Sequence, residues 1–516
     1  MTRRAWVRLD NASNIFLAAW TDADPKVFRI TAEVDDPIDP ALLQQALDTT
    51  FDRYPLYHAV LRRGIFWYYL QDSDLRPTVT PDLRHTCAPL HHPDRKELLF
   101  RVVHHHRRIS LEVFHALSDG TGALWFLTDL VNAYLDLRHP EDRAAAPGET
   151  EDTAAEAPAG TRSPADAPDQ AGSRVSPDSS DQPGSVDTPV SPDTKDSSDS
   201  AIATDPAVDP DPLEGAHPLG LTPDSFVHYF HRTPPPERLG RRVGDVSAHE
   251  AEESATRRPG LVAVRRVHRV TGTRTPDDRP RLIELSMPAT QVLALAKPHG
   301  VPVTLFLTAL FFEAIRESSG GLGKSQTIAA SVPVNLRQFF PSLSPRNFFA
   351  TVRVAHTYGR GDDDLGGICR DLAAQFLPET TPEALEAKLR RFLRFERSPL
   401  LRIVPRPLKD LLLRLINRAN NRGLTVAVSN LGRVVLPEPA EARVRRMLFH
   451  VSAVRPQFCS MTHDGVMTIS FTSPFQEADH VRAFTRMLTE RGVDVTVAAA
   501  RVTEQEIEGA PAGVGA

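Results

Sequence analysis

An abrupt change of composition divides this 516-residue chain into two stretches that can fold and one that cannot. Between Glu141 and Glu214 there are 18 Asp and Glu against 4 Lys and Arg, and no aromatic residue occurs between Tyr134 and Phe226. Such a segment cannot bury enough apolar surface to offset the entropy lost on ordering. We therefore expect a disordered insert and tether over residues 140–260, and a flexible tail over 501–516.

The net charge supports the same division and excludes some partners. The whole chain carries −6 and the segment 141–214 carries −14, so the remainder carries +8. No basic run with interleaved aromatic residues is present, which argues against a nucleic-acid ligand. Cys87, Cys369 and Cys459 lie far apart and form neither a disulfide framework nor a metal-binding spacing. We expect a cytoplasmic, monomeric protein with no bound cofactor.

Consecutive histidines in the first half do not indicate a metal site. His104, His105 and His106 are consecutive, and on a strand successive side chains point to opposite faces. They cannot all bind one ion without distortion, so we predict no metal.

The first half, residues 1–139, predicts a mixed α/β arrangement. A strand over 26–34 precedes a helix that Asp39 caps, with Pro40 at its first position. Strands over 98–105 and 107–114 form a predicted hairpin, because apolar and polar residues alternate along them. From Thr121 the apolar residues fall at three- and four-residue steps, which predicts a helix.

Between that last strand and that helix stands the motif HxxxDG, formed by His115, Asp119 and Gly120. A neutral imidazole can remove a proton from a hydroxyl, amine or thiol near neutral pH if its orientation is fixed. The alternative is a hydrogen-bonded core histidine with no role in chemistry.

The second half, residues 261–500, predicts a further sheet with flanking helices. Two of its small-residue strands end in polar groups, one at Asn335 and Arg337 and the other at Ser429 and Asn430. Helices are expected over 289–296, 303–317, 363–375, 382–396, 408–420 and 479–490. Strands over 443–451 and 465–471 are expected to complete this second sheet.

The three motifs together resemble the chloramphenicol-acetyltransferase-like superfamily of acyl-CoA-dependent acyltransferases. They are HxxxDG, Pro-Val-Asn-Leu-Arg at 333–337 and Ser-Asn-Leu-Gly at 429–432. The superfamily includes condensation domains, wax-ester synthases and plant acyltransferases, and the chain is most similar to its alcohol acetyltransferase group. The resemblance implies an α/β (α+β) sandwich of two such subdomains, over 1–139 and 261–500, with a tunnel between them.

The resemblance also implies roles for the motif residues. His115 would be the general base, Asp119 would be structural and pair with Arg337, and Gly120 would allow a close approach at the tunnel. Asn335, Ser429 and Asn430 would either donate to the developing oxyanion or form strand-end hydrogen bonds. Many members carry a second histidine just before the first, and this chain has Phe114 there, which disfavours a condensation domain.

The implied function is transfer of an acyl group, acetyl or short-chain, from acyl-CoA to a small alcohol or amine. The alternative is a non-catalytic, condensation-domain-like protein that binds an acyl carrier or a hydrophobic ligand. The basic, apolar stretch 402–422 has three interpretations: a grip for coenzyme A phosphates, a helix on an anionic membrane surface, or an ordinary surface helix.

Overall fold

The computed structural model of the chain describes residues 5–141, 267–275, 279–321, 326–396, 404 and 406–499. The tail over 501–516, and nearly all of the insert over 140–260, lie outside these residues. The helices are α1 Asn11–Ala19, α2 Pro40–Arg53, α3 Gly120–Arg138, α7 Ala289–Ala296, α8 Val303–Ser318, α9 Leu365–Phe376, α10 Pro382–Glu396, α12 Arg406–Arg422, α13 Ala440–Arg443 and α14 Asp479–Thr489. Short 3₁₀ helices are η1 Pro55–His58, η3 Lys297–His299, η4 Leu336–Gln338 and η5 Leu377–Thr380.

The strands form three sheets. They are β1 Trp6–Arg8, β2 Val27–Val34, β3 Ala59–Arg63, β4 Tyr68–Asp72, β5 Thr80–Pro81, β6 Phe100–His105, β7 Arg108–Phe114, β8 Arg281–Pro288, β9 Thr327–Asn335, β10 Phe349–Thr357, β11 Val426–Val434, β12 Val444–Val451, β13 Gln457–His463, β14 Val466–Ser473 and β15 Thr496–Ala499. The orders are β1-β4-β3, β12-β2-β7-β6-β5 and β10-β9-β11-β13-β14-β8-β15. This mixed arrangement is the predicted fold class.

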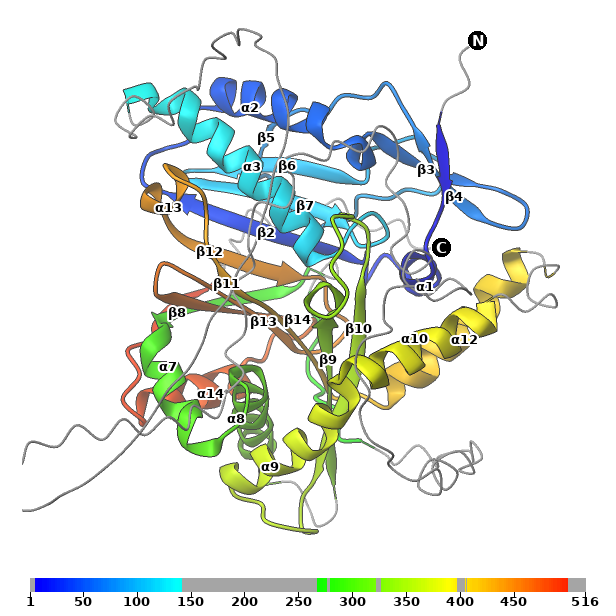
Figure 1. Ribbon diagram of the computed structural model, residues 1–516. Coiled ribbons are helices and arrows are strands. Elements are labelled where there is room, and N and C mark those ends of the chain that lie inside the picture. Colours follow the sequence, from blue (N-terminus) through cyan, green and yellow to red (C-terminus); the bar gives the residue numbers. More distant parts are fainter. Residues whose placement is uncertain are drawn as a thin grey trace, which may run out of the picture.

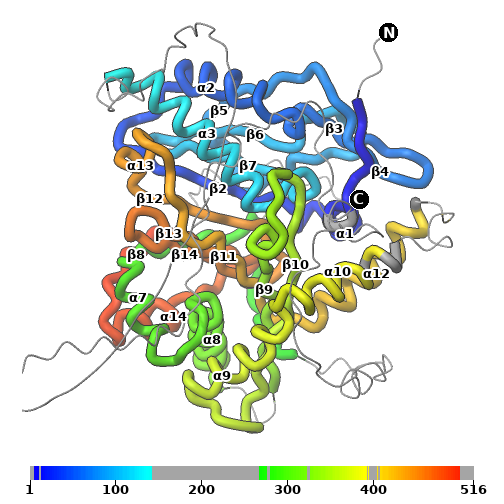
Figure 2. The backbone as a smooth tube through the Cα atoms, viewed as in Figure 1, coloured from blue at the N-terminus to red at the C-terminus, as the bar shows by residue number. Residues whose placement is uncertain are grey.

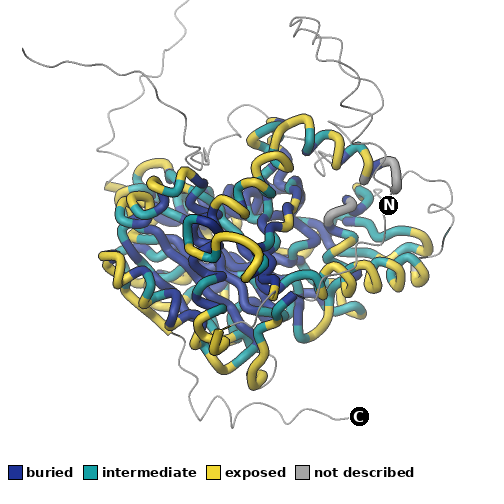
Figure 3. Tube along the Cα trace, turned by 90° about the horizontal axis from the view of Figure 1, so that it is seen from below, coloured by how far each residue is buried: buried dark blue, intermediate teal, exposed yellow. Residues whose placement is uncertain are grey.

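The two large sheets lie between helical layers. Helices α2 and α3 cover the side of the five-stranded sheet that faces away from the seven-stranded sheet, and α7, α8 and α14 cover the far side of the other (Figure 1). Seen after a quarter turn, buried segments fill the middle of the molecule and exposed segments form its outside (Figure 3). Each sheet therefore packs against its own helices, and the sheets meet at the centre.

Strand β12 corrects one expectation. The stretch 443–451 was predicted to complete the second sheet, and it forms the edge of the first instead: β12 pairs antiparallel with β2, with Phe449 opposite Ile30. In Figure 2 the orange β12 runs beside the blue β2. Leu448 and Phe449 point to opposite faces of the strand and are both buried. The apolar pattern therefore identifies a strand that is covered on both faces, but it does not identify the strand that pairs with it.

The same segment closes the hydrophobic core of the first half. That core combines side chains from α2, α3, β2 and β7 with residues contributed by 434–461, among them Val434, Met447 and Met461. The second core is built from residues 283–493 alone. The chain between 434 and 461 thus belongs in space to both halves.

Helix α1 and strand β13 are among the elements that were not predicted, and the others are β1, β5, β15 and α13. Helix α1 begins after Asp10, whose carboxylate accepts a hydrogen bond from the backbone N–H of Ser13 at 2.7 Å. Strand β13 pairs with β14 and β11 at the centre of the second sheet. The Asp10 N-cap was a readable signal for α1, since Asp is a favoured residue at that position.

Within the described residues no single helix is long and apolar enough to cross a membrane. The pair formed by 289–299 and 303–318 passes on length and composition, but it bends by 86°.

Candidate active site

His115 lies just beyond β7, in the turn that leads to α3. Its backbone N–H donates to the carbonyl of Lys26 at 2.8 Å, which continues the pairing of β7 with β2. The half-buried ring stacks on Phe16 of α1, with centroids 3.8 Å apart and planes 13° apart, and meets the edge of Phe28 at 5.0 Å. Phe349, from the second half, lies 5.7 Å away. The imidazole is therefore held between aromatic rings from both halves.

Asn347 fixes the hydrogen-bonding state of this ring. Its amide nitrogen donates to the carbonyl of His115 at 2.8 Å and to the hydroxyl of Ser13 at 2.9 Å. Its oxygen therefore faces Nδ1 of His115, 3.2 Å away. An amide oxygen can only accept, so Nδ1 carries the proton and Nε2 of the neutral ring keeps its lone pair. This is the tautomer in which Nε2 can act as a base.

The ring is neutral over the physiological pH range. Burial lowers the pKa of His115 to about 4, while the negative charge of Asp119 acts in the opposite direction and favours the imidazolium. The bond to Asn347 also favours the charged form. The site thus presents a neutral imidazole whose Nε2 carries no proton. The nearby carboxylate of Asp119 would stabilise a positive charge on the ring.

Asp119 and Arg337 form the expected ion pair. Arg337 Nη1 donates to Oδ2 of Asp119 at 2.7 Å, and both side chains are almost fully buried. The same carboxylate caps α3 by accepting from the N–H of Gly122 at 2.9 Å, and it accepts from the N–H of Phe348 at 2.8 Å. Asp119 consequently joins α3 to the segment 337–348.

The segment 344–348 is fastened to both halves. Arg337 Nη2 donates to the carbonyls of Ser344 and Arg346, each at 2.7 Å. The guanidinium of the fully buried Arg346 in turn pairs with Asp10 at 3.3 Å. These bonds set the position of Asn347, the neighbour of Arg346, relative to His115.

Glycines at the start of α3 allow close packing. A Cβ at Gly122 would lie 2.2 Å from the carbonyl oxygen of Pro345, so no side chain fits there. A Cβ at Gly120 would lie 2.6 Å from a methyl of Leu431. Gly120 was expected to permit a close approach at the tunnel, and the group that approaches it is the Leu431 side chain.

Two of the three candidate oxyanion donors make strand-end hydrogen bonds. The Asn335 oxygen accepts from the N–H of Arg337 at 3.1 Å, and its amide donates to Thr121 at 3.3 Å. The Asn430 oxygen accepts from the N–H of Gly432 at 2.8 Å, and its amide donates to Thr304. Ser429 lies on β11, half-buried and opposite Cys459 of β13.

Across the described ranges no group of three or more His, Cys, Asp or Glu is placed to hold a metal ion. His105 and His106 are exposed at the β6–β7 turn, where His106 has a positive φ of 55°.

Two solved structures share this architecture over nearly their whole length. Polyketide synthase associated protein 5 from Mycobacterium tuberculosis matches with a TM-score of 0.52 and 13% identity, covering 95% of this chain and 99% of that one. The trichothecene 15-O-acetyltransferase of Fusarium sporotrichioides matches with a TM-score of 0.51 and 9% identity, covering 95% of each chain. The chain has the chloramphenicol-acetyltransferase-like fold.

The likeness is one of structure rather than sequence. No family model matches the chain, and no curated protein matches it significantly in sequence. The two chloramphenicol-acetyltransferase-like halves nevertheless bring together HxxxDG from the first and Pro-Val-Asn-Leu-Arg from the second, as the ion pair between Asp119 and Arg337 demonstrates.

Sequence reasoning missed the residues that hold the imidazole. Asn347, Ser13 and Phe16 are distant from His115 in the chain and belong to no motif that was recognised. The signal that could have suggested Asn347 is the polar pair Arg346-Asn347 directly before the apolar residues Phe348 and Phe349.

Proposed function

We propose that this protein is an acyltransferase that moves an acyl group from coenzyme A to an alcohol or amine, with His115 as the general base. The observation that carries the proposal is the bond between His115 Nδ1 and Asn347, because it leaves Nε2 unprotonated. The fold shared with an O-acetyltransferase supports the reaction class. Acetyl or another short acyl group, and a small acceptor, are the proposed substrates.

The proposed reaction uses the imidazole twice. Nε2 takes the proton of the acceptor O–H or N–H while its oxygen or nitrogen attacks the thioester carbonyl. The C–S bond of the tetrahedral intermediate then breaks, and the leaving sulfur takes that proton from the imidazolium. The products are an ester or amide and free coenzyme A, and no covalent enzyme intermediate forms.

The surroundings of His115 suit this sequence of charges. The imidazolium forms only during the reaction, and the charge of Asp119 favours that form. Asp119 itself stays paired with Arg337 and two backbone N–H groups, so we assign it a structural and electrostatic role.

The proposed channel for the two substrates runs between the halves and ends at the imidazole. In support, the rings around His115 come from α1 and β2 on one side and from β10 on the other. Among the three candidate oxyanion donors, Ser429 is the one whose hydroxyl makes no hydrogen bond within the described part of the chain. We propose Ser429 as the first donor to test.

The direct test is acyl transfer from acetyl-CoA to a panel of small alcohols and amines. His115→Ala should lower turnover at least ~100-fold, the usual effect of losing a positioned base. The ring packs against Phe16 and Phe28 but makes no ion pair within the described residues, so we expect the variant to remain folded. Circular dichroism checks that expectation.

The matched control is His105→Ala, which removes an exposed histidine at the β6–β7 turn and should leave turnover unchanged. Equal turnover by the original chain and His115→Ala would refute the base assignment. Absence of transfer with every acceptor and acyl donor in both proteins would favour the alternative, a non-catalytic protein that binds an acyl carrier or a hydrophobic ligand.

A further inference from the structure

A pocket of about 980 Å³ opens beside the helix that covers His115. Its wall includes Ala18, Ala19 and Trp20, while Phe16, which stacks on the imidazole, lies three residues before Ala19 in the same helix. Three helical residues rise about 4.5 Å along the axis. The pocket therefore begins within one turn of α1 from the candidate active site.

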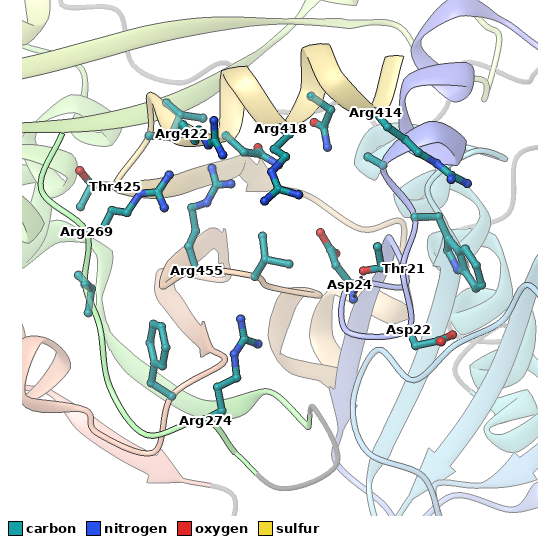
Figure 4. A pocket seen from close by; sticks show the side chains of 18 of the residues that line it. Thr21, Asp22, Asp24, Arg269, Arg274, Arg414, Arg418, Arg422, Thr425 and Arg455 are labelled. Carbon is teal, nitrogen blue, oxygen red and sulfur yellow. Dashed lines mark hydrogen bonds between the residues drawn. The ribbon is translucent and has the colours of Figure 1, made fainter. Parts of the chain in front are cut away.

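Positive charge dominates this pocket. Six arginines and two aspartates line it, so the lining carries a formal charge of +4. The arginines come from three parts of the chain, and their side chains converge beneath the backbone of α12 (Figure 4). The arginines are Arg269, Arg274, Arg414, Arg418, Arg422 and Arg455.

Most of these arginines make no ion pair within the described part of the chain. Apart from Arg274, none of the six makes an ion pair with any residue that the structure describes. Asp24, one of the two acids in the lining, is itself paired with Lys26 and accepts a hydrogen bond from the hydroxyl of Ser452 at 3.0 Å. Burial lowers the pKa of Arg455. The negative charge of Asp24 raises this pKa, and the positive charge of Arg269 lowers it further. Such a cluster would be stabilised by a bound anion.

The arrangement selects the kind of anion. Arg414, Arg418 and Arg422 are spaced four residues apart, so they lie along one face of α12. Guanidinium groups bind phosphate through paired N–H donors. Several guanidiniums spread over about 980 Å³ suit two or more phosphates better than one.

We propose that this basic pocket is a binding site for a multiply phosphorylated group carried by one of the two substrates. The group could belong to the coenzyme A donor or to a phosphorylated acceptor, and both have the same recognition chemistry. That the group is carried by a substrate rests on the proposed transferase function. Binding itself can be tested without any turnover.

A membrane surface fits the pocket less well than a soluble phosphate. The apolar residues Leu408, Leu411 and Leu415 of α12 are exposed by 57%, 51% and 57%. None of these three leucines lines the pocket, which α12 borders with Arg414, Asn417, Arg418, Asn421 and Arg422. A lipid surface would contact these exposed leucines, whereas the concave arginine cluster requires a ligand that enters it.

The test is isothermal titration calorimetry, which measures the affinity of the full chain for inorganic pyrophosphate, adenosine 3′,5′-bisphosphate and coenzyme A. The double variant Arg418→Gln/Arg455→Gln should weaken pyrophosphate binding at least ~10-fold, since two guanidinium contacts are lost. It should not lower the melting temperature of the ligand-free protein, because neither arginine has an ion-pair partner within the described chain. The matched control Arg491→Gln removes a charge beyond α14, outside the pocket, and should bind normally.

Competition experiments identify the source of the phosphates. Displacement of pyrophosphate by coenzyme A and by the bisphosphate assigns the pocket to the donor, and simultaneous binding assigns it to the acceptor. Failure of pyrophosphate to bind, equal affinity of the double variant, or binding only to anionic vesicles would overturn the proposal. The His115→Ala variant separates the two proposals, because it should lose turnover while keeping its affinity for pyrophosphate.

Discussion

At the scale of single residues, the site depends on how one amide orients one imidazole. Asn347 cannot rotate freely, because its nitrogen donates both to the His115 carbonyl and to Ser13. Its oxygen then specifies the proton on Nδ1. A residue 232 positions away in the chain thus decides which nitrogen of His115 is available for chemistry.

The pH dependence of kcat/KM should report the lowered pKa of this ring. A base must be unprotonated to act, and burial lowers the pKa of His115 to about 4. We expect kcat/KM, measured as initial rates, to stay flat from about pH 8 to pH 5 and to fall below that as the ring protonates. An acidic limb near the ordinary value of 6.5 would contradict the assignment.

Asn347→Asp should move that acidic limb to higher pH. The variant places a carboxylate against Nδ1, and a neighbouring negative charge favours the imidazolium, so the pKa of His115 rises. Asn347→Leu removes the acceptor and should lower kcat with little change in KM, because the tautomer is no longer fixed. Ser13→Ala is the control, since it removes one bond of the amide and leaves Nδ1 paired. Identical pH profiles for the original chain and Asn347→Asp would refute the positioning role.

At the scale of elements, the start of α3 is fastened to the segment 335–348. The Asp119 carboxylate caps α3 and binds both Arg337 and the N–H of Phe348. Gly122 admits the carbonyl of Pro345 where any side chain would collide. The HxxxDG aspartate and Gly122 therefore shape a joint between two elements, and the histidine of the motif lies beside it.

Breaking this joint should reduce stability as well as turnover. Asp119→Ala leaves the buried Arg337 without its anion, and removal of one partner of a buried pair costs about 3–5 kcal/mol. Arg337→Met should also destabilise, and the double variant should cost less than the sum of the two. Denaturant unfolding measures each effect.

The control is the exposed pair of Arg370 and Asp362, whose side chains are exposed by 64% and 74%. Arg370→Met should change the unfolding free energy by less than about 1 kcal/mol. Additive effects of Asp119→Ala and Arg337→Met would mean that the two residues do not act as a pair.

At the scale of the whole molecule, the two halves are interlocked rather than merely in contact. Strand β12 extends the sheet of the first half, and the residues around it complete that core. Arg108 of β7 bonds both Glu33 of β2 and Glu284 of β8, and so links the two large sheets. We expect the halves to unfold together, because the core and the sheet of the first half both include residues of the second.

Stability of the whole chain should fall as the pH drops from about 6.5 to 4. Burial lowers the pKa of His91, His115 and His480 to about 4 each, so in this range the unfolded chain binds more protons than the folded one. Stability is therefore complete above pH 6.5 and is lost towards pH 4, by about 1.4 kcal/mol per pH unit for each such histidine.

Urea unfolding at a series of pH values measures this slope. His480→Gln should make the slope shallower, since the replacement does not titrate in this range. Constant stability between pH 6.5 and pH 4 would contradict the burial of these neutral rings.

The sequence alone determined the local elements and the residues that carry the motif. Its apolar periodicity predicted α7 and α10 to the residue, and the Asp39-Pro40 signal predicted the start of α2. These features depend on neighbours three or four positions away, so a single chain reveals them. The proposed partner of Asp119 was also correct, because the resemblance linked two distant motifs.

Only the tertiary structure decided which distant segments meet. The neighbour of β12, the Asn347 amide at His115 and the convergence of arginines beneath α12 all join residues far apart in the chain. Strand alternation gives the same pattern for every possible partner, and a polar residue in sequence does not reveal which group it will bond. The packing of the two halves around β12 decides which strand pairs with which and which group each polar side chain bonds.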